Sequence, residues 1–205
     1  SGSPAEVTAA LVTAGSLVEV SDATATINDA DGTGITATAL SAIGAKTTGT
    51  VTVTNAIAIT GSPSEVTAAL VTSGSLVEVT DATVTITGNP TITELNNIAA
   101  KTTGVVTATL AADSLSNLGA LTTAGTDAIT ITVNDADEAA VTAANLSTLG
   151  GKTAGTVTVT NAVAITGSAS ELTAALVTAS TLVEVSDATA TVNDADAAAI
   201  TATEL

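Results

Sequence analysis

One phrase occurs three times in the chain, and this repetition constrains the fold more than any other feature. The phrase reads Ser-Pro-Ala-Glu-Val-Thr-Ala-Ala-Leu-Val-Thr from Ser3, and close copies begin at Ser62 and Ser168. Each copy continues into Leu-Val-Glu-Val and then Asp-Ala-Thr. Repeats of tens of residues are typical of stacked-repeat proteins, in which each unit buries its apolar face against its neighbours. The sequence therefore predicts a stack of similar units.

Each copy of the phrase begins with a helix-start signal. A serine stands three residues before a glutamate, which is the spacing of a capping box: each side chain accepts a hydrogen bond from a free backbone N–H. The pairs are Ser3 with Glu6, Ser62 with Glu65, and Ser168 with Glu171. Proline occupies the first helical position in two copies, where it costs no hydrogen bond. The apolar stripe that follows predicts helices of about 11 or 12 residues.

Strands and a second kind of helix are predicted between these phrases. Valines that alternate with a glutamate, as in Val18-Glu19-Val20, indicate a strand with the valines inward. The second helix is expected to begin near Asp31, Thr91 or Asp137 and to end at Lys46, Lys101 or Lys152. Lysine in a last turn with glycine just beyond it is typical of a helix stop.

The predicted strands are spaced regularly along residues 1–205. They begin near Val18, Val51, Val77, Val105, Ile129, Val157 and Val183. One parallel strand and one helix per turn, at roughly 24 to 33 residues, predicts an α/β solenoid. The alternative is an all-β solenoid, because Thr and Val are mediocre helix formers. We expect residues 1–205 to form a single domain, in which the units at about 105–133 are divergent. The last residues repeat 34–40, so a fragment of a longer array is expected.

A polar residue followed by alanine comes after most predicted strands. This set comprises Asp22, Asn55, Asp81, Asp127, Asn161 and Asp187. The place is similar to the asparagine position of leucine-rich repeats, which implies a side chain that satisfies backbone groups at the bend after the strand. Stacked turns would then alternate Asp with Asn, and like charges would not be neighbours. We expect a structural ladder.

The triplet Asp-Ala-Asp offers the best candidate metal ligands. It places carboxylates at Asp29 and Asp31, at Asp135 and Asp137, and at Asp194 and Asp196. Calcium prefers clustered carboxylate and amide oxygens, so the triplets are candidate calcium sites. The alternative is a turn in which the second aspartate caps the next helix. The EF-hand pattern fails, because Leu40 stands where the bidentate glutamate belongs.

Composition excludes more functions than it suggests. The 205 residues include 20 acidic groups and three lysines, with no histidine, cysteine, methionine or aromatic residue, and a formal charge of −17. Ordinary nucleophiles, general bases and zinc ligands are therefore missing, so we expect no enzyme and no cofactor. The charge repels nucleic acid and anionic membranes, and no segment predicts membrane insertion.

The phrases Glu-Val-Thr-Ala-Ala-Leu-Val-Thr and Lys-Thr-Thr-Gly-Thr-Val-Thr-Val-Thr-Asn-Ala recur over most of the chain. In these phrases and in composition the chain resembles very large Thr/Val/Ala-rich repeat proteins of the cell surface of cyanobacteria and other aquatic bacteria. The resemblance implies an extracellular structural role in a filament, sheath, surface layer or adhesin stalk. Stacking end to end on copies of itself or on flanking repeats is the expected mechanism. The alternative is a calcium-dependent adhesin, or a module that binds a glycan or a surface protein.

Overall fold

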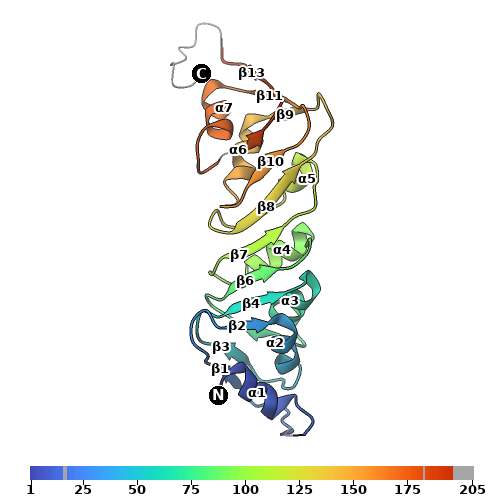
Figure 1. The fold of residues 1–205 in the computed structure, drawn as a ribbon, viewed down its shortest axis with the longest axis vertical. Helices are drawn as coiled ribbons and strands as arrows, with labels where there is room; N and C mark the ends of the chain where they lie inside the picture. Colours follow the sequence, from blue (N-terminus) through green and yellow to red (C-terminus); the bar gives the residue numbers. More distant parts are fainter. Residues whose placement is uncertain (16–17, 182, 196–205) are drawn as a thin grey trace. The chain divides into compact units, whose positions relative to one another are not determined.

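Short helices alternate with pairs of short parallel strands along the chain (Figure 1). The computed structural model describes residues 1–15, 18–181 and 183–195. The chain divides into two compact units, unit 1 (Ser1–Thr109) and unit 2 (Leu110–Leu205). The protein is thus mixed α/β with parallel strand pairing, as the sequence predicts.

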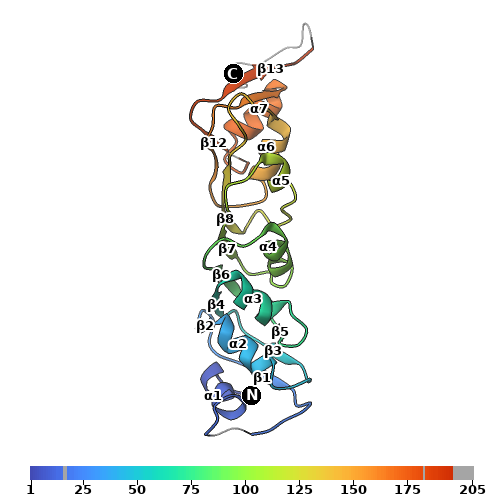
Figure 2. The ribbon, with the colours of Figure 1, turned by 90° about the vertical axis from the view of Figure 1, so that its right-hand side faces the viewer.

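The described residues form seven helices, and six of them have eight residues. They are α1 (Pro4–Leu11), α2 (Ala37–Gly44), α3 (Pro63–Leu70), α4 (Ile92–Ala99), α5 (Leu115–Leu118), α6 (Ala143–Gly150) and α7 (Ala169–Leu176). In unit 1 the helices α1 to α4 follow one another in chain order (Figures 1 and 2), and each packs on the next. The predicted length of 11 or 12 residues was wrong, because the chain turns back after Leu11 and its counterparts. After α1, for example, the N–H groups of Val12 and Thr13 both donate to the carbonyl of Thr8.

Two strands follow most helices. The strands of unit 1 are β1 (Ala25–Ile27), β2 (Gly34–Thr36), β3 (Val51–Val53), β4 (Ala58–Gly61), β5 (Val77–Glu78), β6 (Thr83–Ile86) and β7 (Val106–Thr109). Those of unit 2 are β8 (Ala128–Val133), β9 (Ala140–Thr142), β10 (Val157–Val159), β11 (Ala164–Gly167), β12 (Glu184–Val185) and β13 (Thr189–Val192). We call a helix with the two strands after it an α-β-β block.

Successive blocks pair strand on strand in register. In unit 1 the first strands β1, β3 and β5 form one parallel ladder, in which Ala25 lies beside Val51 and Val51 beside Val77. The second strands β2, β4 and β6 form another parallel ladder, which is continued by β7, the one strand after α4. Unit 2 repeats the scheme with the ladders β8-β10-β12 and β9-β11-β13.

The core of each unit consists of small and medium aliphatic side chains between helices and strands. Ile59 and Val84 on the second strands, and Leu40 and Leu70 on the helices, are at most 1 % exposed in unit 1. Ile165 on the second strand β11 and Leu146 on α6 occupy corresponding places in unit 2. Because each block supplies only a few such side chains, burial depends on the neighbouring blocks.

The expectation of one strand per turn was wrong. The second strands β4 and β11 each bury a single β-branched residue between small neighbours, so their alternating pattern is too short to detect in the sequence. The predicted second helices also begin later than expected: α2 and α6 start after β2 and β9, not near Asp31 or Asp137. The expectation near Thr91 was correct, since Thr91 is the N-cap of α4.

The predicted strand at Val18-Glu19-Val20 is not a strand. Its counterparts β5 and β12 are strands because they pair with β3 and β10. Residues 18–20 have no such partner strand among the described residues. A short extended segment without a ladder partner gains no hydrogen bonds that would define it as a strand.

Candidate functional site

The three Ser–Glu pairs form capping boxes at the starts of α1, α3 and α7. In α3 the Ser62 hydroxyl accepts the Glu65 N–H at 3.4 Å, and the Glu65 carboxylate accepts the Ser62 N–H at 2.8 Å. The bond from the Ser62 N–H, with further bonds from the Thr38 and Ser62 hydroxyls, holds the pKa of Glu65 below its ordinary value. The Thr38 hydroxyl belongs to α2, so this cap also joins neighbouring blocks. Ser3 with Glu6 and Ser168 with Glu171 form the same two reciprocal capping-box hydrogen bonds.

A fourth capping box, which sequence reasoning missed, joins Thr91 and Glu94 at α4. The Thr91 N–H donates to the Glu94 carboxylate at 2.9 Å and holds the pKa of Glu94 below its usual range. The signal was present, because threonine serves as well as serine in the S/T-x-x-E pattern.

The structure groups these polar residues differently from the predicted ladder. Continuing the register past the ends of the paired strands places Asn55 opposite position 29 on one side and position 81 on the other, which gives the order Asp29–Asn55–Asp81. Unit 2 has Asp135–Asn161–Asp187 in the same way. Asp22 and Asp127 precede the first strands β1 and β8 instead of following them, so they lie outside the ladder.

The two asparagines have the role expected of this position. The Asn55 side-chain amide donates to the carbonyl of Asp29, and the Asn161 amide donates to the carbonyl of Asp135 at 2.6 Å. Each therefore satisfies a backbone acceptor of the preceding block. Asp127 has a different role: the residue is 4 % exposed, and its carboxylate accepts the N–H of Ala124 at 3.0 Å.

The second aspartates of two Asp-Ala-Asp triplets accept backbone N–H groups of the next block. Asp31 accepts the N–H of Ala56 and Asp137 that of Ala162, both at 3.1 Å. These second aspartates do not cap the next helix; Thr36 and Thr142 do.

The first aspartates of two triplets receive the first N–H of a helix. Asp135 accepts from Leu115 at 2.7 Å and Asp194 from Ala169 at 2.8 Å. At α1 the corresponding residue is Pro4, which has no N–H, and Asp29 instead accepts the N–H of Ala30. The first aspartates Asp135 and Asp194 thus join a helix to the strands of its own block, whereas Asp31 and Asp137 join neighbouring blocks.

Within the described ranges no group of three or more acidic side chains is placed to hold a metal ion. Asp196 lies outside the described residues. Calcium binding at the other triplet aspartates stays a prediction.

A threonine clamp, which the sequence analysis missed, joins successive blocks. In the phrase Lys-Thr-x-Gly the threonine hydroxyl donates to a backbone carbonyl of the preceding block and accepts the glycine N–H. Thr47 donates to Ala23 and Thr102 to Ala82, each at 2.6 Å. The acceptor bonds from Gly49 and Gly104 are 3.0 Å long.

The clamp in unit 2 is the most buried of the three. Thr153 is 5 % exposed, and its hydroxyl lies 2.9 Å from the carbonyl of Asp127 and 2.8 Å from that of Ile129. It accepts the N–H groups of Ile129 at 2.7 Å and of Gly155 at 2.8 Å. One hydroxyl therefore bonds three backbone groups at once, because it accepts both N–H groups and donates its single proton to one of the two carbonyls.

The glycines of this phrase are required by close backbone approach, not by a helix stop. A Cβ at Gly49 would lie 2.5 Å from the carbonyl oxygens of Asp22 and Ala23. At Gly104 and Gly155 a Cβ would also lie under 3.0 Å from backbone oxygens of the preceding block. The lysines lie two residues beyond the last residues of α2, α4 and α6.

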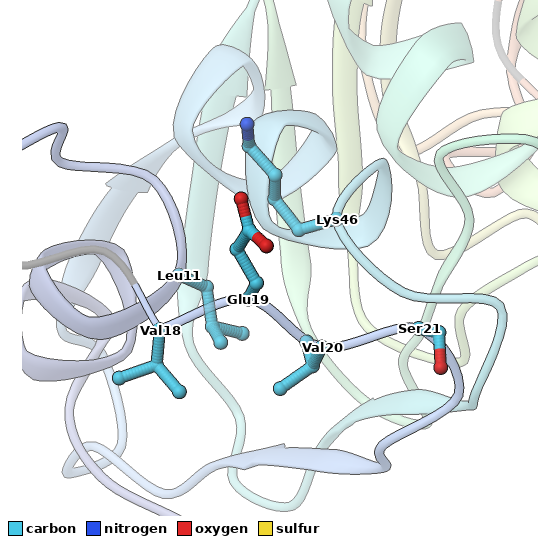
Figure 3. A pocket seen from close by; sticks show the side chains of 6 residues that line it. All are labelled: Leu11, Val18, Glu19, Val20, Ser21 and Lys46. Atoms are coloured by element: carbon cyan, nitrogen blue, oxygen red, sulfur yellow. The ribbon is translucent and has the colours of Figure 1, made fainter.

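A pocket of about 460 Å³ lies beside the end of α1 (Figure 3). Its lining consists of Leu11, residues 18–21 and Lys46. Val18 is 57 % exposed, whereas its counterparts Val77 and Val183 are 1 % exposed. The pocket therefore exposes one valine that the other two copies of the phrase bury.

Comparison with known proteins yields no relatives: no protein family, no curated protein and no solved structure matches the chain. Among the described residues no helix is long and apolar enough to span a bilayer.

Proposed function

We propose that the chain is part of an α/β solenoid with a structural, non-enzymatic role outside the cell, in a filament, sheath, surface layer or adhesin stalk. The observation that supports this role best is the threonine clamp. It appears in both units, with the same chemistry, between successive blocks. The threonine hydroxyls of the clamp bond the backbone of the preceding block, so they are not available to bind a ligand.

The other recurring polar groups point the same way. Asn55 and Asn161, and the triplet aspartates Asp31 and Asp137, all bond to backbone groups of a neighbouring block. Parallel ladders add regular hydrogen bonds, and the short helices cover the strands. Such nearest-neighbour stacking gives a repeat protein a stability that grows with the number of blocks. A formal charge of −17 disfavours lateral aggregation of such rods.

Small-angle scattering of a lengthened chain tests the solenoid. Ser168 restarts the phrase of Ser3, so a second copy of residues 3–167 can be inserted in phase. Six added blocks at the strand spacing of ~4.8 Å should lengthen the particle by roughly 30 Å with an unchanged cross-section. A particle that grows equally in all directions would contradict the solenoid.

Labelling of intact source cells tests the location. An antibody to the chain should bind without permeabilisation, and external protease should remove the signal. Binding that appears only after permeabilisation would contradict the extracellular role.

A further inference from the structure

We propose that the pocket formed by Leu11, residues 18–21 and Lys46 is the docking site for a further α-β-β block whose first strand has the sequence type Val-Thr-Val. The partner is thus a block of the kind α6-β10-β11, joined ahead of α1. The inference rests on the proposed solenoid and names the chemistry of the partner at this end of unit 1.

The first argument is the contrast between copies of one sequence. Val77 and Val183 are each 1 % exposed, whereas Val18 is 57 % exposed. The leucines do not share this contrast: Leu70 is fully buried, whereas Leu11 and Leu176 are both half-buried. Figure 3 shows Leu11, Val18 and Val20 around the open pocket. The residues are the same, so the difference lies in what covers them.

The second argument identifies the missing neighbour. The counterpart β5 pairs with β3, and β12 pairs with β10, both in parallel register. Both partner strands read Val-Thr-Val. In both units a Leu-Val-Glu-Val segment therefore pairs with a Val-Thr-Val strand. Residues 18–20 have no such partner strand among the described residues.

The third argument is electrostatic and excludes the nearest alternative. Register places Glu78 beside Thr52, and Glu184 beside Thr158, so each glutamate has a neutral neighbour across the ladder. A Val-Thr-Val strand would place threonine beside Glu19 as well. If the β12 end of a second copy docked here instead, Glu19 would lie beside Glu184. Like charges directly opposite each other at the strand spacing are destabilising. The site thus discriminates against simple end-to-end pairing of two identical chains.

Cysteine labelling tests this site, because the chain has no cysteine of its own. Val18→Cys is made in the parent chain and in an extended chain, in which the sequence of residues 143–167 replaces Ser1 and Gly2. Gly167 precedes Ser168 just as Gly2 precedes Ser3, so the junction keeps its phase. Val177→Cys, at a valine 69 % exposed, is the matched control.

We expect maleimide to label Val18→Cys at least ten-fold more slowly in the extended chain, with no change at Val177→Cys. The same extension with Thr158→Glu in the added copy should restore part of the labelling rate, most strongly at low ionic strength. Equal rates in the parent and extended chains would overturn the proposal, and so would an added block that circular dichroism shows to be unfolded. Protection of the parent chain at high concentration would overturn the choice of partner. If the lengthened chain scatters as a longer rod but the Val18→Cys thiol of the extended chain is not protected, this inference alone is refuted. If the lengthened chain grows equally in all directions, the solenoid itself is refuted.

Discussion

Replacing Thr153 by valine should destabilise unit 2 more than any exposed threonine substitution. Valine keeps the shape but removes the hydroxyl, which lies 2.7 Å from the Ile129 N–H, 2.8 Å from the Gly155 N–H and within 2.9 Å of two carbonyls. Losing three hydrogen bonds at about 1 kcal/mol each gives a cost of about 3 kcal/mol, and a buried N–H without a partner adds to it. Thr153→Ser keeps the hydroxyl and loses one methyl group, which costs about 0.8 kcal/mol.

Urea unfolding followed by far-ultraviolet circular dichroism measures these differences, because no aromatic residue offers a fluorescence signal. Thr130→Val, at an exposed position of β8, is the matched control and should change the free energy of unfolding by less than about 0.5 kcal/mol. Similar m-values across the variants would show that the same transition is compared. The clamp would be refuted if Thr153→Val lowered the free energy of unfolding by no more than Thr153→Ser does.

Three further substitutions probe other parts of the stack by the same unfolding assay. Gly104→Ala should destabilise by at least about 2 kcal/mol, because its Cβ would meet backbone oxygens, whereas Gly74→Ala, with open space around it, should be neutral; equal effects would contradict the close approach. Ser62→Ala should cost about 1 kcal/mol through loss of the cap, and no cost would show the cap to be dispensable. Glu65→Gln should make the free energy of unfolding less dependent on acid pH. The pKa of Glu65 is lower in the folded chain than in the unfolded chain, so the ionised carboxylate stabilises the fold above the unfolded pKa of roughly 4.3. That stabilisation is lost as the pH falls through the folded pKa. An unchanged pH profile would contradict this role.

The local features of the fold were predictable from the sequence, because their signals lie within a few residues. The Ser62–Glu65 spacing indicates the start of α3 without any knowledge of the rest of the chain. The alternating valines of β3 likewise identify a strand from three residues.

Features that depend on neighbouring blocks were not predictable in this way. Gly49 looks like a helix stop, and only the close carbonyl oxygens of the preceding block reveal its purpose. Asp22 and Asp81 occupy the same place in the repeated phrase, yet only Asp81 joins the ladder, because β5 has a partner strand and residues 18–20 lack one among the described residues. The missed strand β4 buries one isoleucine, Ile59, which a pattern search cannot distinguish from a loop.

The in-register stacking of blocks is tested most directly by a disulfide between neighbouring second strands. Thr60 and Thr85 lie opposite each other on β4 and β6, and both are exposed. At a strand spacing of ~4.8 Å their Cα atoms are within the range of a disulfide, whereas a shift of two residues exceeds it. The pair Thr60→Cys with Thr85→Cys should therefore cross-link rapidly under mild oxidation, and Thr60→Cys with Thr83→Cys should not. Equal rates for the two pairs, or no cross-link in either, would contradict the stacked register.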